Sequence, residues 1–194
     1  MFERAGKEEV AYVYSKPVHY IVLTRRDNTF NMDIVEKYLA ILDRIEASEA
    51  GPGVVVTIGT GDRHFSTGFD LAYWMKSYET MRDSLVRVPR LLARLAGFPM
   101  PTLCVFNGNA IAGGYILGLA HDMRIMNAAT PGVICLSELK IGLPIPYPYM
   151  DLIRAKLEPI VCTKISYGVN FKLDEALADN LIDGTYSNKA DLEK

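Results

Sequence analysis

The strongest constraint on the fold is a set of short, β-branched apolar segments separated by helical segments. Residues 54–59, VVVTIG, form a continuous apolar run, which is typical of a strand buried on both faces of a sheet. Residues 18–24, VHYIVLT, and residues 102–106, TLCVF, have a similar character. Strands that alternate with helices indicate an α/β fold.

The segment after the first of these strands is predicted to be a helix. Asn31 is the expected N-cap, and Asp33 lies in the first turn, where the helix dipole favours a negative charge. Apolar residues then recur at three- and four-residue spacing up to about Ser48, before Gly51-Pro52-Gly53 stops the helix. The same reasoning predicts strands at 123–126 and 133–136 and helices at 112–120, 148–157 and 173–181.

Charge and composition exclude some classes of function. The 194 residues carry a formal net charge of −2, so we expect no nucleic-acid partner, because such proteins usually have a concentrated basic face. The longest glycine-containing apolar stretch, residues 110–120, is too short to cross a bilayer, so no membrane insertion is expected. No repeat or low-complexity linker divides the chain, and we expect one domain over residues 1–194.

The cysteines give no indication of a metal site. Cys104, Cys135 and Cys162 are widely spaced and form no CxxC pair, and the three histidines are not at zinc-site spacing. Each cysteine is flanked by apolar residues. Buried free thiols are therefore expected, and no metal ion.

The first candidate site segment is HFSTGFDL, residues 64–71. Gly68 permits a tight turn, and Asp70 is expected to open the next helix. One interpretation is a turn with an aspartate cap and nothing more. The alternative is that the turn directs the backbone N–H of Phe69 outward as a donor to an anion.

The second segment is NGNAIAGGYILGLAHD, residues 107–122, in which a buried strand leads into a helix that starts with Gly113 and Gly114. Glycine costs helix stability, by roughly 1 kcal/mol relative to alanine in a helix interior. At a helix N-terminus it lets a ligand approach the free N–H groups, where a developing negative charge is stabilised. Close packing of the helix against a strand is the alternative.

The third segment is CLSELKIGLPIP, residues 135–146, in which Glu138 is the only acidic residue. Burial among apolar residues raises the pKa of a carboxyl group and makes it a better proton acceptor at neutral pH. The alternative is a solvated glutamate at a strand end, paired with Lys140.

These three segments, in this order and spacing, resemble the crotonase family, also called the enoyl-CoA hydratase/isomerase family. The resemblance covers roughly residues 18–184 and includes the tail segment GVNFKLDEALADNLID. It implies a spiral of repeated ββα units and an assembly of homotrimers or dimers of trimers. It also implies an acyl-CoA thioester as substrate and no cofactor besides the coenzyme A of that substrate.

The resemblance further implies an oxyanion hole, in which the thioester carbonyl oxygen lies between the N–H groups of Phe69 and Gly113. Contacts with the substrate are then expected from Gly68, Asp70, Leu71 and Gly114. The coenzyme A phosphates are expected to meet basic residues near the first strand and the first turn, and the candidates are Arg25, Arg26, Arg63 and Lys76.

The glutamates help to choose a reaction. Hydratases of the family carry two, and this sequence has Ile116 at the first position and Glu138 at the second. One glutamate without the other resembles the Δ3,Δ2-enoyl-CoA isomerases of fatty-acid β-oxidation, which move a double bond through a thioester enolate. The alternatives are another crotonase reaction, such as hydration, thioester hydrolysis or decarboxylation, and a non-catalytic subunit of a larger assembly.

Two expectations concern the ends of the chain. Family members usually continue into a further helix where this sequence reaches Lys194, so the C-terminal helical extension is expected to be short or missing. We recognise no targeting signal in the residues given. The compartment is left open, with the peroxisome or mitochondrion suggested by the family.

Overall fold

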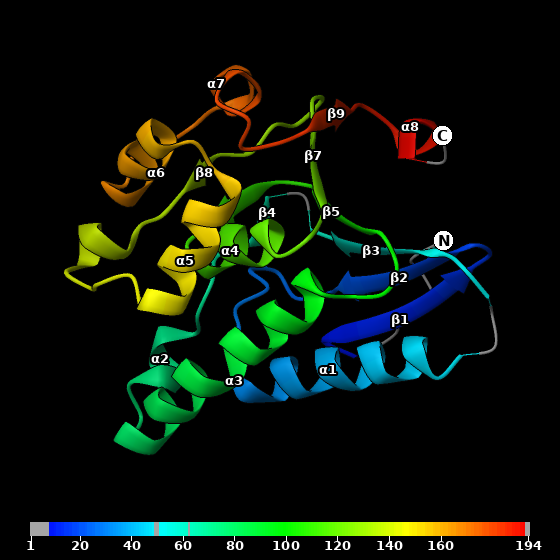
Figure 1. The fold of residues 1–194 in the computed structure, drawn as a ribbon, viewed down its shortest axis with the longest axis horizontal. Helices are drawn as coiled ribbons and strands as arrows, with labels where there is room; N and C mark the ends of the chain where they lie inside the picture. The colour runs from blue at the N-terminus through cyan, green and yellow to red at the C-terminus, as the bar shows by residue number, and fades with distance from the viewer. Residues whose placement is uncertain (1–7, 49–50, 62, 193–194) are drawn as a thin grey trace.

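A computed structural model describes residues 8–48, 51–61 and 63–192. Six strands form the larger sheet in the order β1-β2-β3-β5-β7-β9 (Figure 1). Strand β1 is antiparallel to β2, and every other neighbouring pair is parallel. The strands are β1 (Val10–Ser15), β2 (Val18–Leu23), β3 (Val54–Gly59), β5 (Thr102–Phe106), β7 (Met123–Asn127) and β9 (Gly184–Tyr186).

A second, parallel sheet has the order β4-β6-β8 and consists of much shorter strands. These are β4 (His64–Ser66), β6 (Asn109–Ile111) and β8 (Ile134–Cys135). Three successive units, β3-β4, β5-β6 and β7-β8, each give their first strand to the large sheet and their second to the small one. Helical segments follow each unit, so the chain forms a spiral of ββα units and the predicted α/β fold is confirmed.

The helices that follow the units are α2 (Leu71–Trp74) and α3 (Tyr78–Ala96), then α4 (Gly113–Leu119), then a 3-10 turn η2 (Glu138–Ile141) with α5 (Tyr147–Lys156). The carboxyl ends of parallel strands meet at one edge of a sheet. The segments that leave β4, β6 and β8 therefore lie together, and these are the three segments singled out from the sequence.

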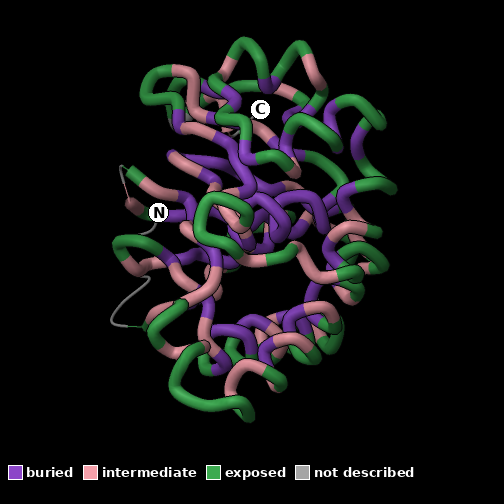
Figure 2. The backbone as a smooth tube through the Cα atoms, turned by 90° about the vertical axis from the view of Figure 1, so that its left-hand side faces the viewer, coloured by how far each residue is buried: buried purple, intermediate pink, exposed green. Residues whose placement is uncertain are grey.

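The main core lies between the large sheet and the helices, where the tube in Figure 2 is buried. Strand β3 is buried along nearly its whole length, as its continuous apolar run predicts. All three cysteines are buried and free, as predicted. Within the described residues, no helix is both long and apolar enough to cross a membrane.

Helix α1 (Met32–Glu46) confirms the predicted amphipathic segment. The side chain of Asn31 caps it by accepting from Ile34 N at 3.0 Å, and the predicted apolar face is buried apart from the partly buried Leu39. The helix ends at Glu46, slightly before the predicted stop.

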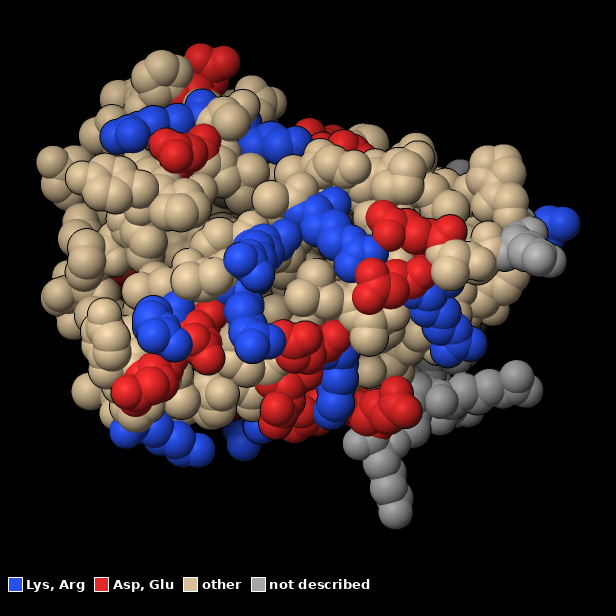
Figure 3. Space-filling model, turned by 60° about the horizontal axis from the view of Figure 1, so that its bottom comes forward, with Lys and Arg blue, Asp and Glu red and all other residues tan. Residues whose placement is uncertain are grey.

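Helix α3 packs on α1 and is tied to it by ion pairs on the outer surface. Arg94 lies 2.6 Å from Asp43 and 2.5 Å from Glu46, and Arg87 pairs with Glu36. Basic and acidic side chains are interleaved on this face (Figure 3). Exposed pairs of this kind contribute roughly 0–1 kcal/mol each, so the apolar inner side of α3 contributes most of the packing energy.

Sequence patterns missed α3, although it has 19 residues. Pro89 lies inside it, and proline normally ends a helix. Strands β1, β4, β6 and β9 and helix α6 (Pro159–Ser166) were also not predicted, whereas α7 (Leu173–Ala178) lies within the helix predicted at 173–181, and α8 (Lys189–Leu192) ends the described chain. Strands of two or three residues are too short to display a period of two, so in the small sheet only β8, within the predicted strand at 133–136, was found from the sequence.

Candidate active site

The turn after β4 fixes the backbone around Phe69. Phe30 N donates to Gly68 O at 2.8 Å, and Asp70 N donates to Phe30 O at 2.9 Å, which makes a parallel bridge between Phe30 and Phe69. In such a bridge Phe30 bonds to the residues on either side of Phe69, so the N–H of Phe69 itself points away from Phe30. No hydrogen bond among the described residues uses that N–H.

The second loop brings Gly113 to the same place. Ala112 precedes α4 with φ 52° and ψ −127°, a conformation rare for a residue with a side chain. Backbone outliers of this kind cost about 1–3 kcal/mol and cluster at functional sites. The conformation sets the orientation of the Ala112–Gly113 peptide, whose N–H likewise has no acceptor among the described residues.

The two loops are in direct contact. A Cβ built on Gly113 would lie 3.3 Å from the Cα of Gly68 and 3.5 Å from ring carbons of Phe69. Gly68 itself has φ +85°, in the left-handed region that favours glycine. The structure therefore brings two unused backbone N–H groups, on Phe69 and Gly113, into neighbouring positions.

Three other residues predicted to contact the substrate are Gly114, Asp70 and Leu71, and the structure places each of them differently. A Cβ on Gly114 would lie 2.4 Å from Ser66 O, so this glycine is needed for the close approach of α4 to β4. Asp70 caps α2 by accepting from Tyr73 N at 3.0 Å. Of Asp70, Leu71 and Gly114, only Leu71 lines the pocket described below.

Glu138 follows β8 and starts the turn η2. One of its carboxyl oxygens, Oε2, is buried and has no hydrogen-bond partner in the described part of the chain. Burial raises the pKa of Glu138 above its ordinary value. Lys140, the alternative partner considered from the sequence, instead donates to Asn170 Oδ1 at 2.8 Å.

Glu138 faces a largely apolar pocket of about 240 Å³. The wall comes from all three segments and from α2, α3 and α5. It consists of Thr67, Phe69, Leu71, Trp74, Met81, Leu85, Ala112, Ser137, Glu138, Ile141, Leu143, Pro144, Pro146 and Tyr149. Glu138 is the only carboxylate among these residues, so any proton transfer to a carboxylate in this pocket involves Glu138.

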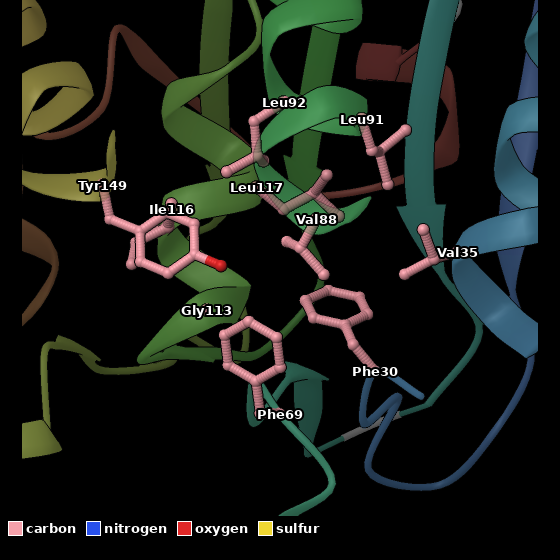
Figure 4. A pocket seen from close by; sticks show the side chains of 10 residues that line it. All are labelled: Phe30, Val35, Phe69, Val88, Leu91, Leu92, Gly113, Ile116, Leu117 and Tyr149. Atoms are coloured by element: carbon pink, nitrogen blue, oxygen red, sulfur yellow. The ribbon is translucent and has the colours of Figure 1, made fainter. Parts of the chain in front are cut away.

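A second, smaller cavity of about 10 Å³ adjoins the pocket and has room for no more than one water molecule (Figure 4). Phe69 and Tyr149 belong to the walls of both spaces. Ile116, in the first turn of α4, lines this smaller cavity and is 2% exposed. Ile116 is the residue that was compared with the first glutamate of the hydratases, and this position is therefore apolar and buried.

The basic residues proposed for coenzyme A do not line the pocket. Arg25 lies 3.4 Å from Glu9, and Lys76 lies over the ring of Tyr73 at 5.3 Å. Arg26 and Arg63 are exposed, and both act electrostatically on His64, whose pKa is lowered chiefly by burial. These last two charges therefore lie on the same side of the molecule.

Two aromatic residues of the site were missed from the sequence. The ring of Trp74 stacks on Phe69, with 5.3 Å between the centroids and 10° between the planes. Tyr149 lies 6.1 Å from Phe69 between ring centroids. The spacing of Tyr149 and Ile153, four residues apart on one helix face, was the available signal for a buried tyrosine.

The comparisons with known proteins agree with this geometry. Residues 14–177 match the sequence profile of the enoyl-CoA hydratase/isomerase family. Enoyl-CoA delta isomerase 3 of Arabidopsis thaliana is 31% identical over 179 residues, which cover 88% of this chain and 74% of that protein. The peroxisomal enoyl-CoA delta isomerase 2 of the same plant is 29% identical, over 81% of this chain and 68% of its own length.

Solved structures show the same fold. An enoyl-CoA hydratase from Mycobacterium ulcerans superposes with a TM-score of 0.87 at 25% identity, over 96% of this chain and 81% of that one. An enoyl-CoA hydratase/carnitine racemase from Magnetospirillum magneticum gives 0.86 at 21%, over 97% and 72%. The chain belongs to the enoyl-CoA hydratase/isomerase family, the crotonase family.

Proposed function

We propose that the protein is an isomerase that converts 3-enoyl-CoA to 2-trans-enoyl-CoA in fatty-acid β-oxidation. The observation that carries the proposal is the single carboxylate of the pocket, Glu138, with a buried, unpartnered oxygen and a raised pKa. The similarity to plant enoyl-CoA delta isomerases supports the same choice.

The proposed reaction is a proton shuttle. The Glu138 carboxylate removes a proton from C2, next to the thioester carbonyl, and the C2–H electrons pass into a dienolate whose charge rests on the carbonyl oxygen. The protonated Glu138 then returns the proton at C4, the C3–C4 double bond becomes C2–C3, and the carbonyl re-forms. One carboxylate that faces both carbons is sufficient, and no proton is gained or lost overall.

Stabilisation of the enolate is proposed to come from the unused N–H groups of Phe69 and Gly113. Backbone donors that are already oriented stabilise charge that develops in the transition state without reorganising at that moment. The apolar wall of the pocket strengthens their effect, because the effective dielectric constant is lower than in water. Loss of one such donor typically costs about 10²–10³ in rate.

Hydration is the second candidate reaction, since the family includes hydratases. Adding water to a 2-enoyl-CoA usually needs a second group to orient the water. Ile116 cannot serve, because it is 2% exposed and apolar. The buried isoleucine therefore favours isomerisation over hydration.

The rest of the proposal concerns binding and assembly. An acyl-CoA thioester is the proposed substrate, in keeping with the family match, and coenzyme A enters as part of that substrate. Arg26 and Arg63 are the proposed contacts for its phosphates, because both are exposed and neither forms an ion pair with a described residue. A homotrimer, or a dimer of trimers, is proposed from the family resemblance.

A direct assay tests the function. The purified protein is mixed with a 3-enoyl-CoA, and the absorbance of the conjugated 2-enoyl thioester is followed. We expect the absorbance to rise with wild-type protein. No rise under conditions where the protein binds the thioester would favour a non-catalytic acyl-CoA-binding subunit, and the isomerase proposal would be wrong.

A further inference from the structure

The hydroxyl of Tyr149 is buried in the site without a hydrogen-bond partner. Tyr149 lies in the first turn of α5 and is 2% exposed, and its Oη has no partner in the described residues. An unsatisfied buried hydroxyl costs roughly 1–3 kcal/mol. Unsatisfied groups of this kind are uncommon in folded proteins and call for an explanation.

Two other buried tyrosines of the protein do have hydrogen-bond partners. Tyr38 is hydrogen-bonded to Thr57, and Tyr115 donates to Leu181 O at 3.1 Å. Both are as fully buried as Tyr149. Of these three tyrosines, the two that do not line the pocket have satisfied hydroxyls, and the one on the wall of the pocket does not.

The pocket offers a matching acceptor. Six buried side-chain polar atoms in the described residues have no hydrogen-bond partner, and only two of them line the pocket, Glu138 Oε2 and Tyr149 Oη. One is a carboxylate oxygen, which accepts hydrogen bonds, and the other is a phenol, which donates. The two groups also interact electrostatically, since Glu138 is, after burial, a cause of the raised pKa of Tyr149. The phenol thus stays protonated at neutral pH.

We propose that Tyr149 is a positioning residue that donates a hydrogen bond to the buried oxygen of Glu138, directly once the carboxylate rotates toward it or through one water molecule. The bond holds the carboxylate in one orientation in the pocket. It also favours the ionised form of Glu138 and partly offsets the effect of burial. The role in catalysis rests on the proposed function, whereas the interaction itself does not.

The test removes the hydroxyl and keeps the ring. In Tyr149→Phe, the titration of Glu138 is followed by NMR with ¹³C-carboxyl-labelled glutamate, and Glu138→Gln identifies the resonance. We expect the pKa of Glu138 to rise by about one unit, because a donor to the charged form is lost. The acidic limb of kcat/KM should move to higher pH by the same amount, and kcat should fall about tenfold with KM little changed.

Tyr38→Phe is the matched control, because it removes an equally buried hydroxyl that does not line the pocket. It should lower the melting temperature and leave the titration of Glu138 unchanged. A Tyr149→Phe protein in which Glu138 titrates as in wild type would overturn the proposal. If KM alone rose in that variant, Tyr149 would be a contact for the acyl chain instead.

The titration needs no substrate, so it separates the two proposals. A shifted pKa in a protein without isomerase activity would support the Tyr149–Glu138 interaction and reject the proposed reaction. Isomerase activity in the wild-type protein, together with an unshifted pKa of Glu138 in Tyr149→Phe, would support the proposed reaction and reject the Tyr149–Glu138 interaction.

Discussion

Gly68 and Gly113 are in contact so close that a Cβ built on Gly68 would lie 2.7 Å from the backbone nitrogen of Gly113. The two residues are far apart in the sequence and come from loops that follow neighbouring strands, β4 and β6. The contact sets the distance between the N–H groups of Phe69 and Gly113. A side chain at position 68 would therefore alter the site through the backbone alone.

Gly68→Ala is expected to destabilise the protein and to lower kcat by 10²-fold or more, the usual effect of losing one oxyanion donor. Gly51→Ala is the control, since Gly51 has a similar φ of +78° but nothing within 4 Å of its Cβ position. That control should show only the cost of backbone strain, about 1–2 kcal/mol. Urea unfolding and steady-state kinetics measure both. Equal losses in the two variants would mean that the contact with Gly113 is unimportant.

Gly113→Pro should remove one N–H donor and also disturb the turn, because Ala112 before it has φ 52°, whereas a residue before proline prefers extended backbone. The helix α4 itself should persist, since Gly113 is its first residue, a position where proline is well tolerated. Gly113→Ala adds a methyl group but keeps the N–H, and therefore reports the steric effect alone. We expect the activation free energy of the proline variant to exceed that of the alanine variant by about 3–4 kcal/mol. Circular dichroism checks the fold, and equal rates in the two folded proteins would argue against a donor here.

Phe69 offers a complementary test. If Phe69 contributes through its N–H, Phe69→Leu should keep much of the rate, apart from the loss of the ring stack on Trp74. Aromatic pairs contribute roughly 0.5–1.5 kcal/mol beyond the area they bury, so a modest fall in melting temperature is expected. Complete loss of activity in a folded variant would instead give the side chain itself an essential role.

Glu138→Gln should abolish isomerisation and leave binding of the CoA ester largely intact. Glutamine keeps the size of the side chain but cannot accept a proton at neutral pH. Turnover is followed by absorbance, and binding by calorimetry with a saturated acyl-CoA. Wild-type turnover in this variant would show that Glu138 is not the base.

The same variant should change how stability depends on pH. Because burial raises the pKa of Glu138 in the folded protein, the folded state binds this proton more tightly than the unfolded chain. The stability that this group contributes is therefore present below the unfolded pKa and is lost as pH rises through the folded value. Glu138→Gln should thus raise the melting temperature at neutral pH, and the difference should shrink as the pH falls toward 4.5, the ordinary value for glutamate. A melting-temperature difference that does not change with pH would contradict the raised pKa.

Ile116→Glu should destabilise the protein by several kcal/mol, because it buries a carboxylate next to an apolar cavity. Ile116→Met controls for the change in packing.

The wild-type protein should form little or no 3-hydroxyacyl-CoA from a 2-enoyl-CoA, as judged by chromatography of the products. Abundant 3-hydroxyacyl-CoA would move the assignment to the hydratases.

Local signals in the sequence determined most of the large sheet and the helix α1. Strands β2, β3 and β5 are runs of β-branched and apolar residues, and a strand buried on both faces requires such a run wherever it lies. The cap at Asn31 and the apolar face of α1 are equally local, since they depend on neighbours three or four residues away.

The glycine turns and the acidic residue in an apolar stretch were likewise visible in the sequence, because backbone freedom and the cost of burying charge are properties of residue types. Only the tertiary structure decided how these parts meet. The contact of Gly68 with Gly113, the helix α3 with Pro89 inside it, and the unpartnered hydroxyl of Tyr149 beside Glu138 all depend on residues that are distant in the chain. No local pattern records such contacts, because side-chain packing between segments carries no fixed spacing along the sequence.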